Sequence, residues 1–306
     1  GVPYVHVALA AVVPALLYYF AVIVQVHFEA HRLGFKGLPR EQLPPLLKLL
    51  RQKGHLLIPL IGIIYFLIGG YTPLKAAYNG ILITIAVSWL NKETRMTPAR
   101  FIAALESGAR SALGVACACA TVGIIVGTAT LTGLGLRIAN AIVTLAGGSL
   151  ILTLLLTMVA CILLGAGLPT TANFIVTSTM AAPALHSLGV PPMAAYMFVL
   201  YFGIAADLSP PVALAAYAGA GIAGADPMRT GMTAVKLALA GFIVPFIYVY
   251  NPILVLEGYS FLPFVSATVT AMMGVVLLGM STVGFYRGDL SIWKRILAFA
   301  GAIGLL

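Results

Sequence analysis

The sequence predicts an all-α polytopic membrane protein that contains a re-entrant hairpin and a discontinuous helix. Of its 306 residues, 61% are hydrophobic and only 8% are charged, whereas soluble domains are about 25% charged. Apolar runs long enough to cross a bilayer, roughly 20 residues each, recur along the chain. Two of the apolar stretches are interrupted, by GAGLPTTAN at 165–173 and by DLSPPVAL at 207–214. These interruptions predict the hairpin and the broken helix.

The distribution of Lys and Arg residues gives the orientation of the predicted spans in the membrane. We expect spans at 4–28, 55–70, 73–90, 110–132, 192–222, 232–251 and 262–284, while the apolar run 296–306 is too short to cross. All of the 17 Lys and Arg residues except Lys75 and Arg137 fall in four segments, 31–53, 91–110, 225–236 and 286–295. The positive charge behind the net charge of +9 is therefore concentrated on one side of the predicted spans. It does not form the kind of surface that binds nucleic acid. The positive-inside rule assigns these segments to the cytoplasm.

This orientation constrains residues 150–188, which must begin and end on the outer side. Their apolar arms, Leu150–Leu164 and Phe174–Leu188, are each too short to span but long enough to reach the midplane. One long helix kinked at Pro169 is the alternative, and it would invert everything that follows. Non-helical backbone at this depth is tolerated only when it is buried in protein or lines a cavity.

The hairpin tip carries groups suited to binding an ion or a substrate. The candidate residues are Gly165, Gly167, Pro169, Thr170, Thr171 and Asn173. Glycines let a backbone approach an ion closely, and the Thr and Asn side chains supply oxygens and donors. The threonines have a purely structural alternative, because Thr hydroxyls often bond back to carbonyls of their own helix.

The second interruption adds Asp207, Ser209, Pro210 and Pro211. Adjacent prolines remove two backbone donors and disfavour helix at the preceding residue, and an acid within a span is a functional hypothesis by default. Carbonyl, hydroxyl and carboxylate oxygens suit a hard cation such as Na⁺, or a proton carried on Asp207. We expect one cation site shared with the tip, and neither a cofactor nor any other metal. Alternatively, Asp207 caps the half-helix that follows.

Several stretches resemble a known family. GLPTTANFI, GVPPMAAYMFVLYFGIAADLSPPVALAAYAGAGIAGADPMRTG, GFIVPFIYVYNPIL, LGVACACATVGIIVGTATLTGLGLR and YYFAVIVQVHFEAHRLGFKG agree with it in order and spacing. Together they resemble the fused permease of the tripartite ATP-independent periplasmic (TRAP) transporters, of the TAXI type, over about residues 1–260. The resemblance implies Na⁺- or H⁺-coupled uptake of an organic anion, which a periplasmic binding protein delivers to a permease in the bacterial or archaeal inner membrane.

The resemblance also implies an ion-transporter-type fold of two inverted repeats, of which this chain carries the second. We therefore expect the C-terminal part of a longer permease, whose remaining N-terminal part is a partner. The implied organisation is the last helix of the first repeat at 1–28, a cytoplasmic linker at 29–54, scaffold and arm helices at 55–149, a transport-domain half at 150–252 and extra helices at 253–306. Within that half lie the hairpin 150–188, the broken helix 192–222 and the helix 232–251.

Other classes fit the residues less well. A stand-alone dicarboxylate or anion symporter of the same architecture is the main alternative, and a non-catalytic subunit of a membrane complex is another. A membrane enzyme needs a nucleophile with a base, or paired acids, and Asp207 has no such companion in the sequence around it. Ion-gradient-dependent, saturable uptake separates a carrier from a channel. The identity of the anion is not encoded in these patterns.

Overall fold

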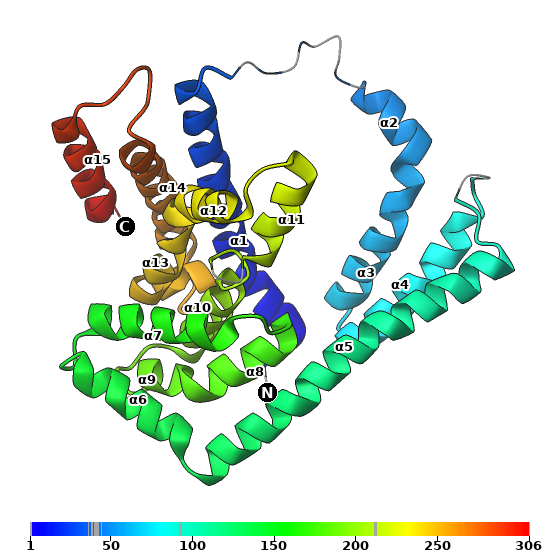
Figure 1. The fold of residues 1–306 in the computed structure, drawn as a ribbon, viewed down its shortest axis with the longest axis horizontal. Helices are drawn as coiled ribbons and strands as arrows, with labels where there is room; N and C mark the ends of the chain where they lie inside the picture. Colours follow the sequence, from blue (N-terminus) through cyan, green and yellow to red (C-terminus); the bar gives the residue numbers. More distant parts are fainter. Residues whose placement is uncertain are drawn as a thin grey trace. The chain divides into compact units, whose positions relative to one another are not determined.

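The computed structural model describes residues 2–35, 37, 39, 43, 45–91, 94–210 and 213–305, and every regular element within them is a helix. Figure 1 traces these helices along the chain. The chain divides into two compact units, one of Gly1–Leu9 with Lys36–Gly114 and one of Ala10–Phe35 with Val115–Leu306. The prediction of an all-α protein is confirmed.

The first unit is centred on two closely packed helices. Its elements are α2 (Leu46–Lys53), η2 (Gly54–Leu57), α3 (Ile58–Ile68), α4 (Pro73–Ser88) and the start of α5 (Pro98–Leu131). A methyl group on Gly62 of α3 would lie 2.6 Å from Ile83 Cδ1, and one on Gly80 of α4 would lie 2.5 Å from Ile63 Cγ1. Each helix thus presents a glycine to an isoleucine of the other, and this reciprocal fit lets the two backbones approach closely.

The second unit contains the predicted hairpin and broken helix. Its elements are α1 (Tyr4–Arg32) from Ala10 onward, the end of α5, α6 (Leu134–Leu145), α7 (Leu150–Gly165), α8 (Thr170–Met180), α9 (Ala182–His186), α10 (Pro192–Ala205), α11 (Leu214–Ala223), α12 (Pro227–Phe242), α13 (Val244–Tyr250), η3 (Pro252–Val255), α14 (Phe261–Val283) and α15 (Ile292–Leu305). Helix α10 contacts α7, α8, α9 and α13. It is therefore an element through which the hairpin joins the rest of this unit.

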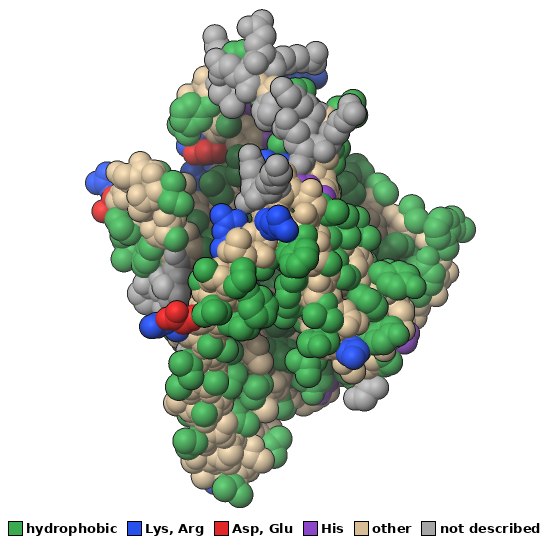
Figure 2. All heavy atoms as spheres, turned by 90° about the vertical axis from the view of Figure 1, so that its right-hand side faces the viewer, with side chains coloured by type: hydrophobic (Ala, Val, Ile, Leu, Met, Phe, Trp, Pro, Cys, Tyr) green, Lys and Arg blue, Asp and Glu red, His purple; other side chains and the backbone are tan. Residues whose placement is uncertain are grey.

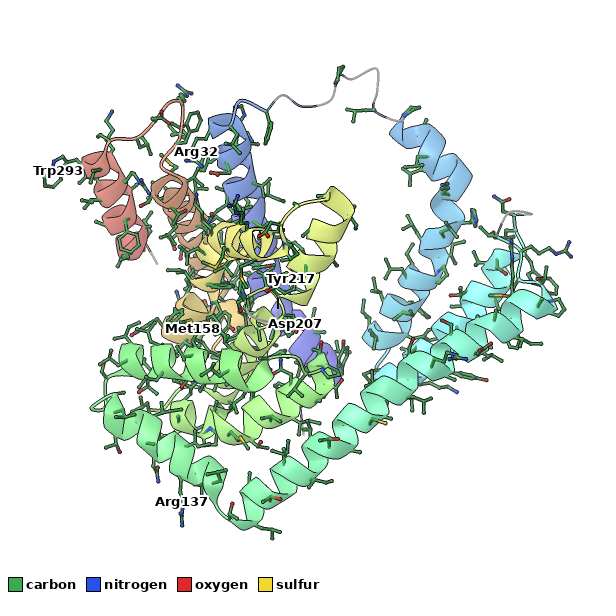
Figure 3. The ribbon with its side chains drawn as sticks, in the orientation of Figure 1. Arg32, Arg137, Met158, Asp207, Tyr217 and Trp293 are labelled. Atoms are coloured by element: carbon green, nitrogen blue, oxygen red, sulfur yellow. The ribbon has the colours of Figure 1, made fainter. Side chains whose placement is uncertain are left out.

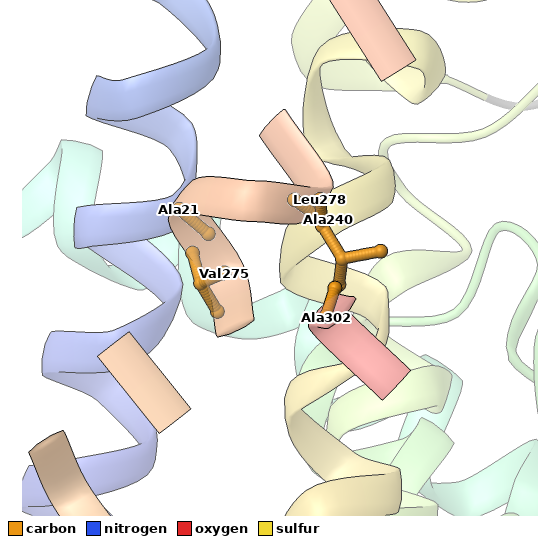
Figure 4. Close-up of a cluster of buried hydrophobic side chains, with 5 residues drawn as sticks. All are labelled: Ala21, Ala240, Val275, Leu278 and Ala302. Carbon is orange, nitrogen blue, oxygen red and sulfur yellow. The ribbon is translucent and has the colours of Figure 1, made fainter. Parts of the chain in front are cut away.

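Small side chains hold α1, α12, α14 and α15 together. Ala21, Ala240, Val275, Leu278 and Ala302 form one buried cluster to which each of these four helices contributes (Figure 4). Three of the five residues are alanines, and small residues allow close helix packing where lipid supplies no hydrophobic driving force.

A buried amide reinforces the contact between α1 and α12. Gln25 of α1 is completely buried. In the orientation that satisfies both of its polar atoms, the amide nitrogen donates to the Lys236 carbonyl at 3.1 Å and the oxygen accepts from the Ala240 N–H at 2.8 Å. Gln25 therefore bonds a carbonyl and an N–H one turn apart on α12, which fixes the register of the two helices.

Length and surface character confirm a polytopic membrane protein. Among the described residues, four stretches are long and apolar enough to cross a bilayer: α1, α5, α14 and the stretch Pro227–Tyr250, which joins α12 and α13. Large apolar side chains are widely exposed, as in Leu131, Leu145 and Ile222, and apolar atoms cover much of the face in Figure 2. An apolar surface of this extent requires lipid or another protein to cover it.

The helix bounds differ from the expected ones in several places. The second hairpin arm, expected at Phe174–Leu188, is divided between α8 and α9 at Ala181. Residues 110–132, expected as a span, belong to the longer helix α5, which begins at Pro98. The stretch 232–251, expected as one helix, is divided between α12 and α13 at Ile243, because Pro245 supplies no N–H to continue the ladder. Residues 134–145, for which no helix was expected, form α6.

Candidate functional site

The first break separates α7 from α8 at residues 166–169. Gly167 adopts a φ of +76°, a conformation that only glycine reaches without strain. Pro169 precedes α8, where its missing N–H costs nothing, and its carbonyl accepts from Asn173 N at 2.9 Å. Helix α8 then runs back along α7, which it contacts (Figure 1). The predicted helix–break–helix hairpin is thus present, while its depth in the membrane stays a prediction.

The second break separates α10 from α11 at residues 206–213. The end of α10 tightens into i→i+3 bonds, from Ala206 N to Gly203 O at 3.2 Å and from Asp207 N to Ile204 O at 3.1 Å. Ala213 adopts a φ of +38° before α11 resumes the helix. The predicted discontinuous helix is therefore present. Pro211, one of the candidate residues, lies outside the described residues.

The candidate residues of the tip fall into two environments. Gly167, Thr170 and Thr171 are exposed, so the first residues of α8 present hydroxyls and free N–H groups on the unit's surface. Gly165 and Asn173 are buried instead. The tip thus has an open side and an enclosed side.

Asn173 is wedged between α7 and α10. A methyl group on Gly165 would lie 2.6 Å from Asn173 Nδ2, and one on Gly203 would lie 2.5 Å from Asn173 Oδ1. The side chain is thus enclosed by two glycine faces, and the residue is only 1% exposed. Neither of its amide atoms has a hydrogen-bond partner in the part of the chain that the structure describes. An orphaned buried amide costs free energy, so this one calls for an explanation such as a bound ion.

Asp207 faces a cavity of about 400 Å³ within the second unit. The walls are mainly apolar and come from α1, α10, α12 and α13, with Tyr18, Tyr201 and Tyr248 among the lining residues. Asp207 Oδ1 is buried and has no hydrogen-bond partner among the described residues. Figure 3 shows Asp207 where α10 gives way to α11. A carboxylate therefore borders a partly open, mainly apolar space at the second break.

Ser209 and Pro210 have structural roles that the geometry makes plain. Ser209 Oγ donates to the Ala205 carbonyl at 3.0 Å, which leaves its lone pairs available. Pro210 packs against α12, where a methyl group on Gly231 would lie 3.1 Å from its Cγ. The prolyl ring thereby anchors the second break to the neighbouring helix.

Comparison with known families decides the identity. The sequence model of one family, described as "Tripartite ATP-independent periplasmic transporter, DctM component", matches residues 1–262. The chain belongs to this DctM family. No curated protein and no solved structure matches the chain.

Membership in the DctM family fixes the class of function. The chain is a transporter permease component and not an enzyme. Permeases of this family generally work with a periplasmic binding protein and a small permease. The resemblance to TRAP permeases is confirmed, whereas the TAXI type and the C-terminal position stay predictions. Helices α14 and α15 lie beyond the matched residues apart from the first two residues of α14.

The structure of this DctM chain joins the two breaks through a residue that sequence reasoning missed. Gly203 was not among the candidates, yet it contacts Asn173 and precedes Asp207 by four residues, about one helical turn or 6 Å. The signal in the sequence was a glycine one turn before an intramembrane acid. The four cavity tyrosines, Tyr18, Tyr19, Tyr201 and Tyr248, were missed as well, because tyrosines in apolar helices indicate packing as often as binding.

Proposed function

We propose that this DctM chain carries out cation-coupled uptake of an organic anion, with Na⁺ or H⁺ as the coupling ion. The observation that carries the proposal is the buried Asn173 amide, which has no hydrogen-bond partner among the described residues and lies against Gly203, four residues before Asp207. A cation accepts electron density from carboxylate, amide and hydroxyl oxygens, and Asp207, Asn173 and Ser209 supply one of each. The cation would give Asn173 Oδ1 the partner that this atom lacks among the described residues.

The exposed start of α8 suits the anion. The first N–H groups of a helix have no intrahelical partner and carry the positive end of the helix dipole, and here the hydroxyls of Thr170 and Thr171 lie beside them. Broken helices of transporters use this arrangement for anionic substrates. We place the substrate carboxylate at this end of α8, with the cation behind it at Asn173 and Asp207.

The decisive experiment is uptake by the complete transporter in proteoliposomes. We expect substrate accumulation when either an inward Na⁺ gradient or an inward proton gradient is imposed, and none when both gradients are abolished. Uptake also responds to membrane potential when each cycle carries more cation charges than the anion has negative charges. Equal accumulation without any cation gradient would contradict the proposal.

A periplasmic binding protein is the proposed source of the anion. The outer segments expected to dock it are 133–140 and 188–192, and Arg137 of α6 is exposed there and points away from the helices around it (Figure 3). We expect uptake to fail when the binding protein is omitted, and Arg137→Glu to lower the apparent affinity for that protein. Lys75→Glu, whose site lies in the other unit, serves as the charge-matched control. Normal uptake without a soluble component would favour a stand-alone symporter.

Topology is tested by labelling single cysteines in the inner membrane of intact cells. Ser187, Arg137 and Arg229 are all exposed, and a background without Cys117, Cys119 and Cys161 removes the native thiols. If α7–α8 forms a re-entrant hairpin, cysteines at 187 and 137 react with an impermeant reagent from the periplasm. A cysteine at 229 does not. Labelling of position 229 from the periplasm would indicate that the hairpin spans the membrane instead.

A further inference from the structure

Gly203 is the point at which the hairpin and the broken helix touch most closely. A methyl group added to Gly203 would lie 2.5 Å from Oδ1, 3.1 Å from Cγ and 3.2 Å from Nδ2 of Asn173. A methyl group added to Gly165 would lie 2.8 Å from the Gly203 carbonyl oxygen, and it would also overlap the Asn173 amide. Real Cβ atoms do not come within 3.0 Å of such neighbours. Both positions therefore require glycine for a steric reason, although neither has a positive φ.

The carboxamide of Asn173 has only these surfaces to set its position. Its atoms lack hydrogen-bond partners among the described residues, so no network orients them. The rest of α8 around it is regular, because Asn173 N bonds to the Pro169 carbonyl and Thr177 Oγ1 donates to the Asn173 carbonyl. The backbone of Asn173 is thus fixed by α8, while its side chain is held by steric contact with α7 and α10.

We infer that Gly203 is a positioning residue, which holds the Asn173 carboxamide in register with Asp207 so that the hairpin and the broken helix bind the cation as one body. Asp207 lies four residues after Gly203, in the turn that ends α10, so a shift of Asn173 against Gly203 changes the spacing of Asn173 and Asp207. The inference rests on the proposed function for its effect on the cation, but its steric part stands independently.

The test is a double-mutant cycle in the complete transporter, with Na⁺ as the probe. Gly203→Ala is expected to raise the Na⁺ concentration for half-maximal uptake about two- to a hundredfold, the range of couplings between contacting residues. It is also expected to lower the thermal unfolding midpoint. Gly219→Ala is the matched control, since it lies within α11 with no neighbour within 4 Å of its added methyl group. Alanine favours helix over glycine, so the control should not lower the midpoint.

A second variant distinguishes steric overlap with the Asn173 side chain from a general loss of stability. Asn173→Ala removes the carboxamide, so adding it to Gly203→Ala should restore the unfolding midpoint while the Na⁺ dependence stays weakened. Additive effects on the midpoint, or an unchanged Na⁺ requirement in Gly203→Ala, would overturn the inference. If wild-type uptake depends on no cation, the proposed function fails, and the cycle of unfolding midpoints alone decides whether Gly203 positions Asn173.

Discussion

Asp207→Asn is expected to abolish the cation dependence of uptake while leaving the protein folded. The amide keeps the size of the carboxylate but carries neither its charge nor a transferable proton, so it removes coupling by Na⁺ and by H⁺ alike. Asp207 is half-buried, so its charge is only partly screened from a bound cation, and losing a charged partner of this kind costs about 1.5–3 kcal/mol, or roughly ten- to a hundredfold in cation affinity. Uptake as a function of Na⁺ concentration and of pH, in proteoliposomes, measures it.

The structure weakens the main alternative for Asp207. A capping role would require its carboxylate to accept from the first N–H groups of α11, yet the N-cap position of α11 is Ala213 and no side chain caps this helix in the described part of the chain. The Asp207 backbone carbonyl reaches α11 instead, accepting from Ala215 N at 3.4 Å. Asn is a good cap, so unchanged Na⁺ and pH dependence in Asp207→Asn would remove Asp207 from the coupling site. Ser209→Ala offers a milder comparison, because the Ser209 hydroxyl already donates to the Ala205 carbonyl at the end of α10.

Phe202→Ala is expected to cause the largest loss of stability. Phe202 is fully buried on α10, and its ring lies against those of Phe198, Phe242 and Phe246, with centroids 4.8 Å, 6.1 Å and 5.9 Å away. Truncating a buried Phe costs about 3–5 kcal/mol through lost contacts and the cavity left behind. The thermal unfolding midpoint of the purified protein should therefore fall by several degrees or more.

A matched control distinguishes the loss of buried packing from the mere replacement of a phenylalanine by alanine. Phe261 at the start of α14 is 67% exposed, so Phe261→Ala should leave the midpoint within the range of ordinary surface substitutions, about 0.5 kcal/mol. Equal effects of the two substitutions would show that the aromatic cluster does not hold α10 against α12 and α13. A large effect of Phe202→Ala alone would identify the cluster as the support of the second break.

The sequence predicts the parts of this fold that backbone chemistry dictates. Pro169 and the adjacent Pro210 and Pro211 cannot continue a helical ladder, so both breaks are evident from the residues themselves. Composition and the one-sided placement of Lys and Arg are enough to predict a polytopic helical protein. These signals lie in short stretches of sequence, so they can be interpreted without knowing which helices contact one another.

The parts that depend on packing were not predictable. Gly203 looks like any glycine of an apolar helix until the fold places Asn173 against it. The continuity of α5 through 98–131 was hidden because its polar beginning and apolar end differ in character along a single helix. Thr170 and Asn173 belong to the same predicted tip and, three residues apart, to the same side of α8, yet Thr170 is exposed and Asn173 is buried. That distinction requires the partner surface, which only the tertiary structure supplies.

The cluster of Ala21, Ala240, Val275, Leu278 and Ala302 has a consequence for biosynthesis. Ala21 is made about 250 residues before the α14 side chains that cover it, and ribosomes add about 5–20 residues per second. The small-residue face of α1 therefore waits roughly 10 to 50 seconds in the membrane for its permanent neighbours. During that interval lipid or an insertion chaperone must shield Gln25, whose two partners on α12 do not yet exist. The contacts of α1 with α12 and α14 can therefore form only late in synthesis, long after α1 itself has been made.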